Sequence, residues 1–203
     1  GLGDVYKRQN QYCKLITRDS DGYRATVDTP YSNLGGIQTS GVDVQFNWGF
    51  PLLAGKMNLN SVVNFLDYYR DQVSPADPFI ESTGTFRSGG QYKYRLLNTL
   101  NYSQGGWSAG LRHRFLPSIK DAAYATNPNT TVLPVGSYGQ LDAFGSYWVN
   151  KQISLRGGID NVTNRAPPRV GVNPGQTAAA GITNAQYYDV LGRRYYVSVR
   201  VTL

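Results

Sequence analysis

Apolar and polar residues alternate along most of this chain with a period of two. In its last stretch, Tyr195, Val197, Val199, Val201 and Leu203 fall on one side, and most positions between them are polar or charged. A period of two indicates a β-strand with one apolar and one polar face. Because the apolar side is rich in β-branched and aromatic residues, we expect it to lie against a protein core or against lipid.

The same alternation predicts further strands along the chain. With the terminal strand, the expected strands span residues 37–50, 57–69, 92–102, 107–115, 138–149, 153–159 and 194–203. By this alternation Tyr69 shares the apolar face of its strand with Phe65, and Tyr92 shares that of the next strand with Tyr94. Nearer the N-terminus, Asp21-Gly22 between two short β-prone runs predicts a hairpin.

Short and long connections between these strands alternate without exception. The short turns cover residues 51–56, 104–106 and 150–151, and the long segments cover 70–90, 117–137 and 161–190. In an up-and-down antiparallel sheet, every short turn then lies at one rim and every long loop at the other. This asymmetry is typical of outer-membrane barrels with short periplasmic turns and long extracellular loops. The expected fold class is therefore all-β: an antiparallel up-and-down transmembrane β-barrel, represented by about seven to eight strands of a larger barrel.

Strand parity predicts that the chain begins in the middle of such a barrel. Bacterial single-chain barrels have even strand counts with both termini normally in the periplasm, whereas the confident strands here are odd in number. Residues 1–9 resemble translated sequencing adapter and are left out of the fold. Residues 10–203 are expected to form the C-terminal part of a barrel domain, without a plug domain.

Composition narrows the function classes. No apolar run approaches the roughly 18 to 20 residues of a membrane helix, so a membrane span would have to be built from β-strands. The net charge is +7, but lysines and arginines are scattered singly, and no zinc-knuckle or helix-turn-helix pattern occurs. Nucleic-acid binding is therefore not expected.

Three short motifs carry a family resemblance. Thr39-Ser40-Gly41-Val42-Asp43, the run Gly158-Ile159-Asp160-Asn161-Val162-Thr163-Asn164, and the run from Tyr188 to Tyr195 resemble the C-terminal third of TonB-dependent outer-membrane receptors. The resemblance implies a barrel of about 22 strands with a plugged lumen. It also implies active uptake of a siderophore, cobalamin or oligosaccharide across the outer membrane of a Gram-negative bacterium, with energy passed on by TonB.

The resemblance extends to partners and to an assembly signal. The implied partners are outer-membrane lipid and lipopolysaccharide, the substrate, the barrel-assembly machinery, and the TonB complex through an N-terminal region that this chain lacks. The residues assigned to the assembly signal are Gly192, Tyr195, Val197, Val199, Val201 and Leu203. The family's last residue is usually Phe, so Leu203 departs from the pattern. Cys13 lies where relatives often carry an extracellular-loop cysteine, whose partner would be upstream.

No catalytic, cofactor or metal site is expected. His113, the single histidine, shares the outward face with Leu111 and Phe115 near the outer rim, which suits contact with lipopolysaccharide head groups better than catalysis. The sequence contains no phosphate-binding glycine loop, metal-spaced cluster or nucleophile elbow. The charged residues expected to face the lumen are Arg112, Arg114, Asp142, Arg156, Asp160 and Arg200.

Two readings of the long last loop and two rival functions remain open. Residues 161–190 are either a ligand-contacting or gating segment or a covering without a contact role. A passive porin would carry a charge-lined constriction loop and no plug. A soluble β-barrel or sandwich that binds a ligand would form a compact monomer without detergent.

Overall fold

The computed structural model describes residues 15–28, 35–170 and 183–202. It divides into two compact units, Gly1–Leu34 and Gly35–Leu203. Residues 1–9, Cys13 and Leu203 lie outside the described residues, so the expectations for them stay predictions.

The first unit contains the expected hairpin. Strands β1 (Ile16–Arg18) and β2 (Arg24–Val27) pair antiparallel. Asp19 closes the turn between them, since its Oδ1 accepts hydrogen bonds from the backbone N–H groups of Tyr23 at 2.8 Å and Asp21 at 3.1 Å. Gly22 has a φ of 85°, a left-handed conformation that glycine adopts without steric cost.

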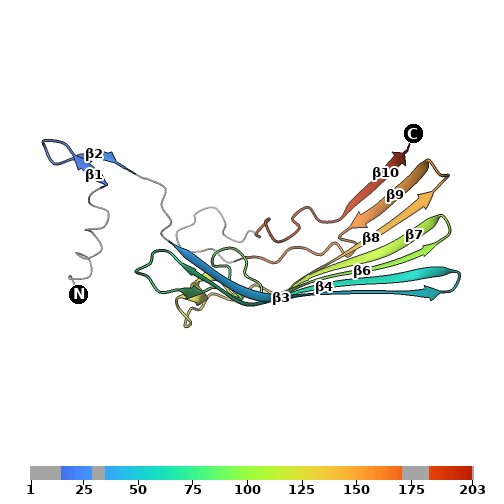
Figure 1. Ribbon diagram of the computed structural model, residues 1–203, viewed down its shortest axis with the longest axis horizontal. Helices are drawn as coiled ribbons and strands as arrows, with labels where there is room; N and C mark the ends of the chain where they lie inside the picture. The colour runs from blue at the N-terminus through green and yellow to red at the C-terminus, as the bar shows by residue number, and fades with distance from the viewer. Residues whose placement is uncertain (1–14, 29–34, 171–182, 203) are drawn as a thin grey trace. The chain divides into compact units, whose positions relative to one another are not determined.

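The second unit is one open antiparallel sheet whose strand order follows the chain (Figure 1). Its main strands are β3 (Gly36–Leu52), β4 (Gly55–Gln72), β6 (Tyr94–Gln104), β7 (Trp107–Leu116), β8 (Tyr138–Trp148), β9 (Ile153–Asp160) and β10 (Arg194–Val201). The two-residue strand β5 (Ile80–Glu81) pairs with the end of β4. Among the described residues β3 and β10 are the two edges, so the sheet does not close. The expected all-β, up-and-down, partial-barrel architecture is confirmed.

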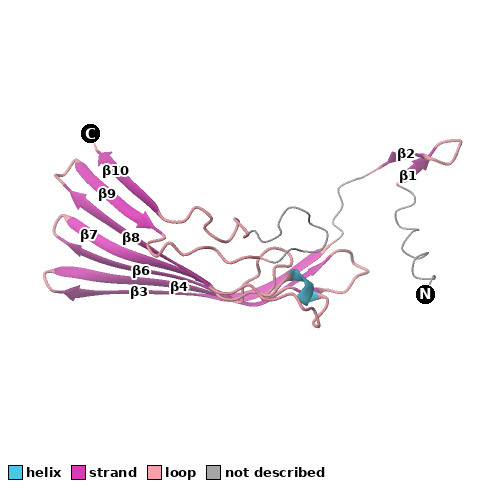
Figure 2. Ribbon diagram, turned by 180° about the vertical axis from the view of Figure 1, so that it is seen from behind, coloured by secondary structure: helices cyan, strands magenta, loops and turns pink. Residues whose placement is uncertain are grey.

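All short turns lie at one end of this sheet and all long connections at the other (Figure 2). At the β8–β9 turn, Asn150 Oδ1 accepts from the backbone N–H groups of Gln152 at 2.9 Å and Ile153 at 2.8 Å. The long connection before β8 includes the 3₁₀ helix η1 (Ala122–Ala125). In the part of the chain that the structure describes, no helix is long and apolar enough to cross a membrane.

Strand register divides the sheet into two unlike faces, because directly paired residues of an antiparallel sheet point to the same side. The bare face carries large apolar side chains that remain exposed, such as Val197 at 83% and Val199 at 61%. The covered face carries Tyr138, Gln140 and Asp142, which are only 4–5% exposed beneath the long connections. A wholly soluble sheet would leave its apolar face buried rather than bare.

Two aromatic positions differ from the alternation. The register runs Ser40↔Tyr68 and then Gly41↔Leu66, so one extra residue of β4 forms a β-bulge. Beyond the bulge Tyr69 pairs with Thr39 and joins the covered face, and its expected place beside Phe65 is wrong. Tyr92 precedes the first residue of β6 and is 2% exposed in the loop core, so its expected place on the apolar face is also wrong.

A row across β7 to β10 alternates glycine with an aromatic ring on the covered face. Gly110 pairs with Phe144, Phe144 with Gly158, and Gly158 with Tyr196. A Cβ at Gly110 would lie 2.5 Å from Phe144 Cζ, and one at Gly158 would lie 2.5 Å from the Tyr196 hydroxyl oxygen. The two rings therefore occupy the space that the glycines leave free.

Candidate functional site: the covered face and its loops

Register places the six charged residues singled out in the sequence on one face of the sheet. In the strand register Arg112 lies opposite Asp142, and Asp160 lies opposite Arg194 at the start of β10. The remaining residues, Arg114, Arg156 and Arg200, are an even number of positions from these along β7, β9 and β10, or lie opposite a residue that is, so their side chains point to the same side. All six therefore belong to the covered face: Arg112, Arg114, Asp142, Arg156, Asp160 and Arg200.

Asp142 is the centre of a buried polar network. One carboxylate oxygen lies 2.7 Å from Arg114 Nη2, and the other accepts from Gln140 Nε2 at 2.9 Å. The same Oδ1 accepts from the backbone N–H of Asn161 at 3.0 Å. With 5% of its surface exposed, Asp142 needs these donors, because an unpaired buried carboxylate is strongly unfavourable. Through the bond from Asn161, the network connects the end of β9 to β8.

Asn161 also holds the segment that follows β9, through hydrogen bonds of its side chain. Its side chain accepts from the backbone N–H of Arg165 at 2.8 Å and donates to the Arg165 carbonyl at 3.0 Å. Asn161 itself is fully buried and has a φ of 53°, a conformation that asparagine tolerates better than most residues. The sequence motif that contains Asn161 thus has a structural role at the top of the sheet.

Arg194 joins the terminal strand to its preceding loop. Its guanidinium lies 3.1 Å from Asp189 Oδ1 and 3.5 Å from Asp160 Oδ2. By contrast, Arg112, Arg156 and Arg200 have no carboxylate within ion-pair distance among the described residues, although Arg112 lies 5.7 Å from the centre of the Phe144 ring. These three arginines therefore bring positive charge to the covered face without a carboxylate partner among the described residues.

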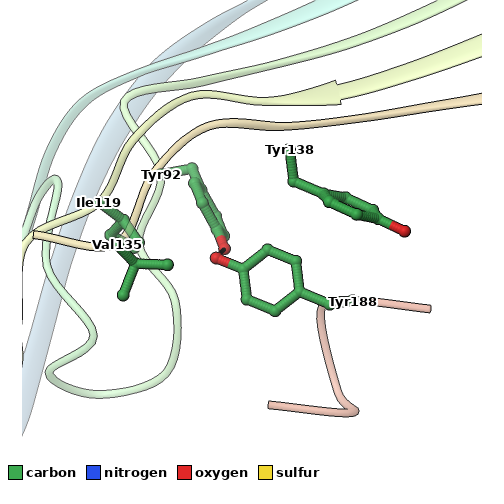
Figure 3. Packing of buried hydrophobic residues seen from close by; sticks show 5 residues of the cluster. All are labelled: Tyr92, Ile119, Val135, Tyr138 and Tyr188. Atoms are coloured by element: carbon green, nitrogen blue, oxygen red, sulfur yellow. Dashed lines mark hydrogen bonds between the residues drawn. The ribbon is translucent and has the colours of Figure 1, made fainter. Parts of the chain in front are cut away.

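A small aromatic core joins the long connections over the sheet (Figure 3). The hydroxyl of Tyr92 donates to that of Tyr188 at 2.7 Å, and the Tyr187 hydroxyl accepts from the backbone N–H of Gly90 at 2.6 Å. Burial raises the pKa of Tyr92 and of Tyr188, so both hydroxyls are protonated at neutral pH. The buried members of this core are Tyr92, Ile119, Val135, Tyr138 and Tyr188.

The loop after β4 is held by a second polar cluster. Asp71 pairs with Arg87 at 3.0 Å and accepts hydrogen bonds from Ser82 and Ser88 at 2.8 and 2.9 Å. Glu81 pairs with Arg70 at 3.0 Å. Burial tends to raise the pKa of Glu81, but hydrogen bonds from Thr83 and Arg70 outweigh this and lower it to about 2.

Residues assigned to the assembly signal occupy the bare face of the terminal strand. Tyr195, Val197, Val199 and Val201 are 59–83% exposed. Gly192, just before β10, has a φ of 71°, and a Cβ there would lie 3.1 Å from Asn164 Oδ1. These facts give the positions of the residues, and their recognition by an assembly machinery stays a prediction.

His113 lies on the bare face in a row with two other polar residues. Register pairs it with Asn98, which pairs with Ser61, and Ser61 Oγ donates to Asn98 Oδ1 at 2.6 Å. The serine is thus bonded to the amide and not to the imidazole, so these three residues do not form a nucleophile–base pair. Among the described residues, no three His, Cys, Asp or Glu side chains converge on a point where they could hold a metal ion.

Sequence reasoning gave no role in this site to several residues of the face, above all Arg95, Tyr188 and Asp189. The Arg95 guanidinium donates to the Gly90 carbonyl at 2.9 Å and lies 5.3 Å from the centre of the Tyr92 ring. Arg95 alternates with Tyr94 and Leu96 in the sequence, so its place on the polar face of β6 could have been found from this alternation. Tyr188 and Asp189 belong to a loop, where no periodicity indicates which side chain turns toward the sheet.

One family model matches the chain. It is described as TonB dependent receptor-like, beta-barrel, and it covers residues 5–162, more than half of the 203 residues. Neither the curated proteins nor the solved structures include a match to this chain.

Proposed function

Since this chain belongs to the TonB-dependent receptor family through its β-barrel domain, we propose that it forms wall and extracellular loops of a receptor for active uptake of a scarce substrate. The receptor lies in the outer membrane of a Gram-negative bacterium and takes up a siderophore, cobalamin or an oligosaccharide. Its work is transport rather than chemical conversion, and it needs no cofactor.

The division of the sheet into two faces carries this proposal. Apolar residues such as Val197 remain exposed on the bare face, whereas charged residues such as Asp142 are buried on the other. A bare apolar face suits contact with lipid, and a charged face suits contact with the polar lumen of a barrel. The residues proposed to face the lumen are Arg112, Arg114, Asp142, Arg156, Asp160 and Arg200.

The proposed partners are those that the family membership implies. The bare face contacts outer-membrane lipid and, near the long connections, lipopolysaccharide. The barrel-assembly machinery reads Gly192 and the exposed row of β10, and the TonB complex supplies energy from the periplasm. The loops that pack on Tyr92 and Tyr188 capture the substrate, because long loops on a rigid scaffold commonly carry binding residues.

Thiol labelling on intact cells tests the orientation. Two variants of the full-length protein are made in a Cys13→Ser background. One carries a cysteine in place of exposed Asn129 in a long connection, and the other carries a cysteine in place of exposed Ala54 in a short turn. A membrane-impermeant maleimide is expected to label Asn129→Cys but not Ala54→Cys until the cells are lysed. Labelling of both on intact cells, or recovery of the protein in the soluble fraction, would refute the proposal.

A growth assay separates active uptake from passive diffusion. Cells that depend on the protein for a ferric siderophore, cobalamin or an oligosaccharide are compared with and without TonB. Loss of growth without TonB is the expected result for one of the three. Equal growth in both strains would instead identify a porin.

A further inference from the structure

Three polar residues lie side by side in the middle of the otherwise apolar bare face. Ser61, Asn98 and His113 pair in register on the neighbouring strands β4, β6 and β7, and we call them the polar row. Each has an apolar residue two positions before it and another two positions after it on the same face: Leu59 and Val63, Leu96 and Leu100, and Leu111 and Phe115.

The proposed lipid contact of the bare face places the polar row at the depth of the hydrocarbon core. Between the row and the long connections lies a layer of aromatic rings, in which the Tyr94 ring centre is 6.3 Å from that of Phe65 and 6.2 Å from that of Phe115. Aromatic side chains of barrels gather at the membrane interfaces, so the row lies on the hydrocarbon side of such a girdle. This depth replaces the contact with lipopolysaccharide head groups that the sequence suggested for His113.

Hydrogen bonds within the sheet satisfy only part of the polar row. Ser61 Oγ donates to Asn98 Oδ1 at 2.6 Å. In the described part of the chain, the amide nitrogen of Asn98 and the ring nitrogens of His113 have no hydrogen-bond partner. Lipid tails offer no partner either, and polar groups at membrane depth are rare on surfaces that face lipid. Another protein surface is therefore needed to cover the row.

We propose that a second copy of this chain covers the polar row, in a dimer whose two-fold axis passes near Asn98. The proposal rests on the proposed lipid contact of the bare face and goes beyond it. Two copies inserted in one membrane have the same orientation, so their polar rows lie at the same depth. A two-fold axis along the membrane normal then brings Asn98 against Asn98 of the other copy.

The chemistry of the row suits contact with an identical surface. A carboxamide is both donor and acceptor, so each Asn98 can donate from Nδ2 to Oδ1 of the other copy, which accepts from Ser61 and has a second lone pair. An isologous interface requires such reciprocal contacts. Among the described residues of the bare face next to the row there is no Asp, Glu, Lys or Arg, so like charges do not oppose the contact.

Energy transfer between copies in lipid vesicles tests the dimer. Full-length protein with its native cysteines replaced by serine carries a donor or an acceptor dye at Ala54→Cys, an exposed position in a short turn. We expect transfer that exceeds random encounter and saturates as the ratio of protein to lipid rises. Transfer no greater than that of randomly distributed protein would overturn the proposal.

Two matched leucine variants separate the polar row from the rest of β6. Asn98→Leu changes the bare face, whereas Asn101→Leu makes the same replacement on the covered face of the same strand. Asn98→Leu should lower the dimerisation constant about tenfold or more, because it removes hydrogen bonds between groups inside the membrane. Asn98→Gln keeps the amide and should retain the dimer, as should Asn101→Leu. Since leucine suits a lipid-facing position, Asn98→Leu should fold, and dimerisation equal to that of the unaltered protein would refute the role of the row.

Spin-label distances locate the axis. A nitroxide at Leu100→Cys lies two positions from Asn98, and one at Val199→Cys lies on the bare face of β10, four strands from β6. In the dimer, the distance between the labels of the two copies should be shorter at position 100 than at position 199. Equal distances, or the opposite order, would place the contact elsewhere and overturn the proposal.

The outcomes separate this inference from the proposed function. If the thiol labels on intact cells show the expected orientation but the protein is monomeric in vesicles, the dimer alone fails. If the protein dimerises through Asn98 but growth does not depend on TonB, the proposal of active uptake alone fails.

Discussion

The hydroxyl of Tyr92 donates a 2.7 Å hydrogen bond to the hydroxyl of Tyr188, across 96 positions of the chain. Tyr92 precedes β6 and Tyr188 precedes β10, so this bond joins loops that belong to opposite halves of the sheet. Both side chains are 2% exposed. The loop assembly on the covered face therefore depends on contacts that no single hairpin contains.

Removing one of these hydroxyls should cost more than half of what removing both costs. Tyr92→Phe leaves the Tyr188 hydroxyl buried without its partner, which costs about 1–3 kcal/mol, whereas the double Phe variant leaves no orphan. Denaturant unfolding of the two single variants and the double variant, as a double-mutant cycle, measures the coupling. Strictly additive losses would show that the two hydroxyls act independently.

Asp142→Leu should destabilise the long-connection end of β8 and β9. It leaves the buried Gln140 amide and Asn161 N–H without their acceptor, and a buried group left unpaired costs about 1–3 kcal/mol. Arg114 is 49% exposed and regains water, so the loss of its ion pair adds less. Asp43→Leu, at an exposed position of the same face, is the matched control and should cost far less. Unfolding in lipid vesicles measures both. Equal losses would show that burial of Asp142 does not control its contribution.

Arginine should be tolerated on the covered face and not on the bare face. Val44→Arg and Val199→Arg should each cost about 2–4 kcal/mol near the bilayer midplane. Gln45→Arg and Ser198→Arg are one position away along the same strands and should cost much less. Folding yield in vesicles compares the four variants. The opposite ranking would mean that the two faces are exchanged.

Acid should loosen the loop that contains Glu81. The pKa of this carboxyl is lowered from its ordinary value of 4.5 to about 2, because hydrogen bonds from Thr83 and Arg70 outweigh the effect of burial. A lowered folded-state pKa contributes stability above the unfolded value, and this contribution is lost as pH falls from about 4.5 toward 2. Since the Glu81 side chain is 47% exposed, the effect is modest. A fluorophore at Ala76→Cys reports it, and Glu81→Gln should reduce the pH dependence. Asp71 keeps the rest, because burial tends to raise its pKa but hydrogen bonds from Arg87, Ser82 and Ser88 outweigh this and lower it.

The glycine–aromatic row should not accept a methyl group. Gly110→Ala would bring its Cβ to 2.5 Å from the Phe144 ring and 2.7 Å from the Leu100 carbonyl oxygen, and the backbone oxygen cannot move away. Overpacking of this kind typically costs about 1–3 kcal/mol. Gly136→Ala meets nothing within 4 Å and is the control. The unfolding midpoints of Gly110→Ala and Gly136→Ala in detergent are compared. Equal midpoints would show that the row has room for a methyl group.

The strands were predictable from sequence, because alternation is a local property that each strand displays by itself. The register across the β8–β9 turn was not predictable in this way: a two-residue turn at Asn150–Lys151 would pair Trp148 with Ile153, whereas Trp148 pairs with Ser154. Tyr69 was misplaced because a bulge breaks the parity without any mark in the alternation. Tyr92 was misplaced because the partner of its hydroxyl, Tyr188, lies 96 positions away in the chain.

The candidate site was predictable only in part. The polar parity of β7 and β8 put Arg112 and Asp142 on one face, which register bears out. No local pattern could show that Asp189 would face Arg194 or that Asn161 would bond to Asp142, since loop side chains acquire their partners only after the strands have assembled. Whether the six charged residues line a lumen stays a prediction.

The strict neighbour order of the sheet has a consequence for how the chain folds. Every strand of the main path pairs with the strand next to it in that order, so each pairing closes only the connection between the two, and loop-closure entropy stays small. The sheet can therefore grow by the addition of one neighbouring strand at a time. The bond between Tyr92 and Tyr188 has the opposite character, because it closes a long stretch of chain. It follows that the loops lock over the covered face last, once β10 is in place.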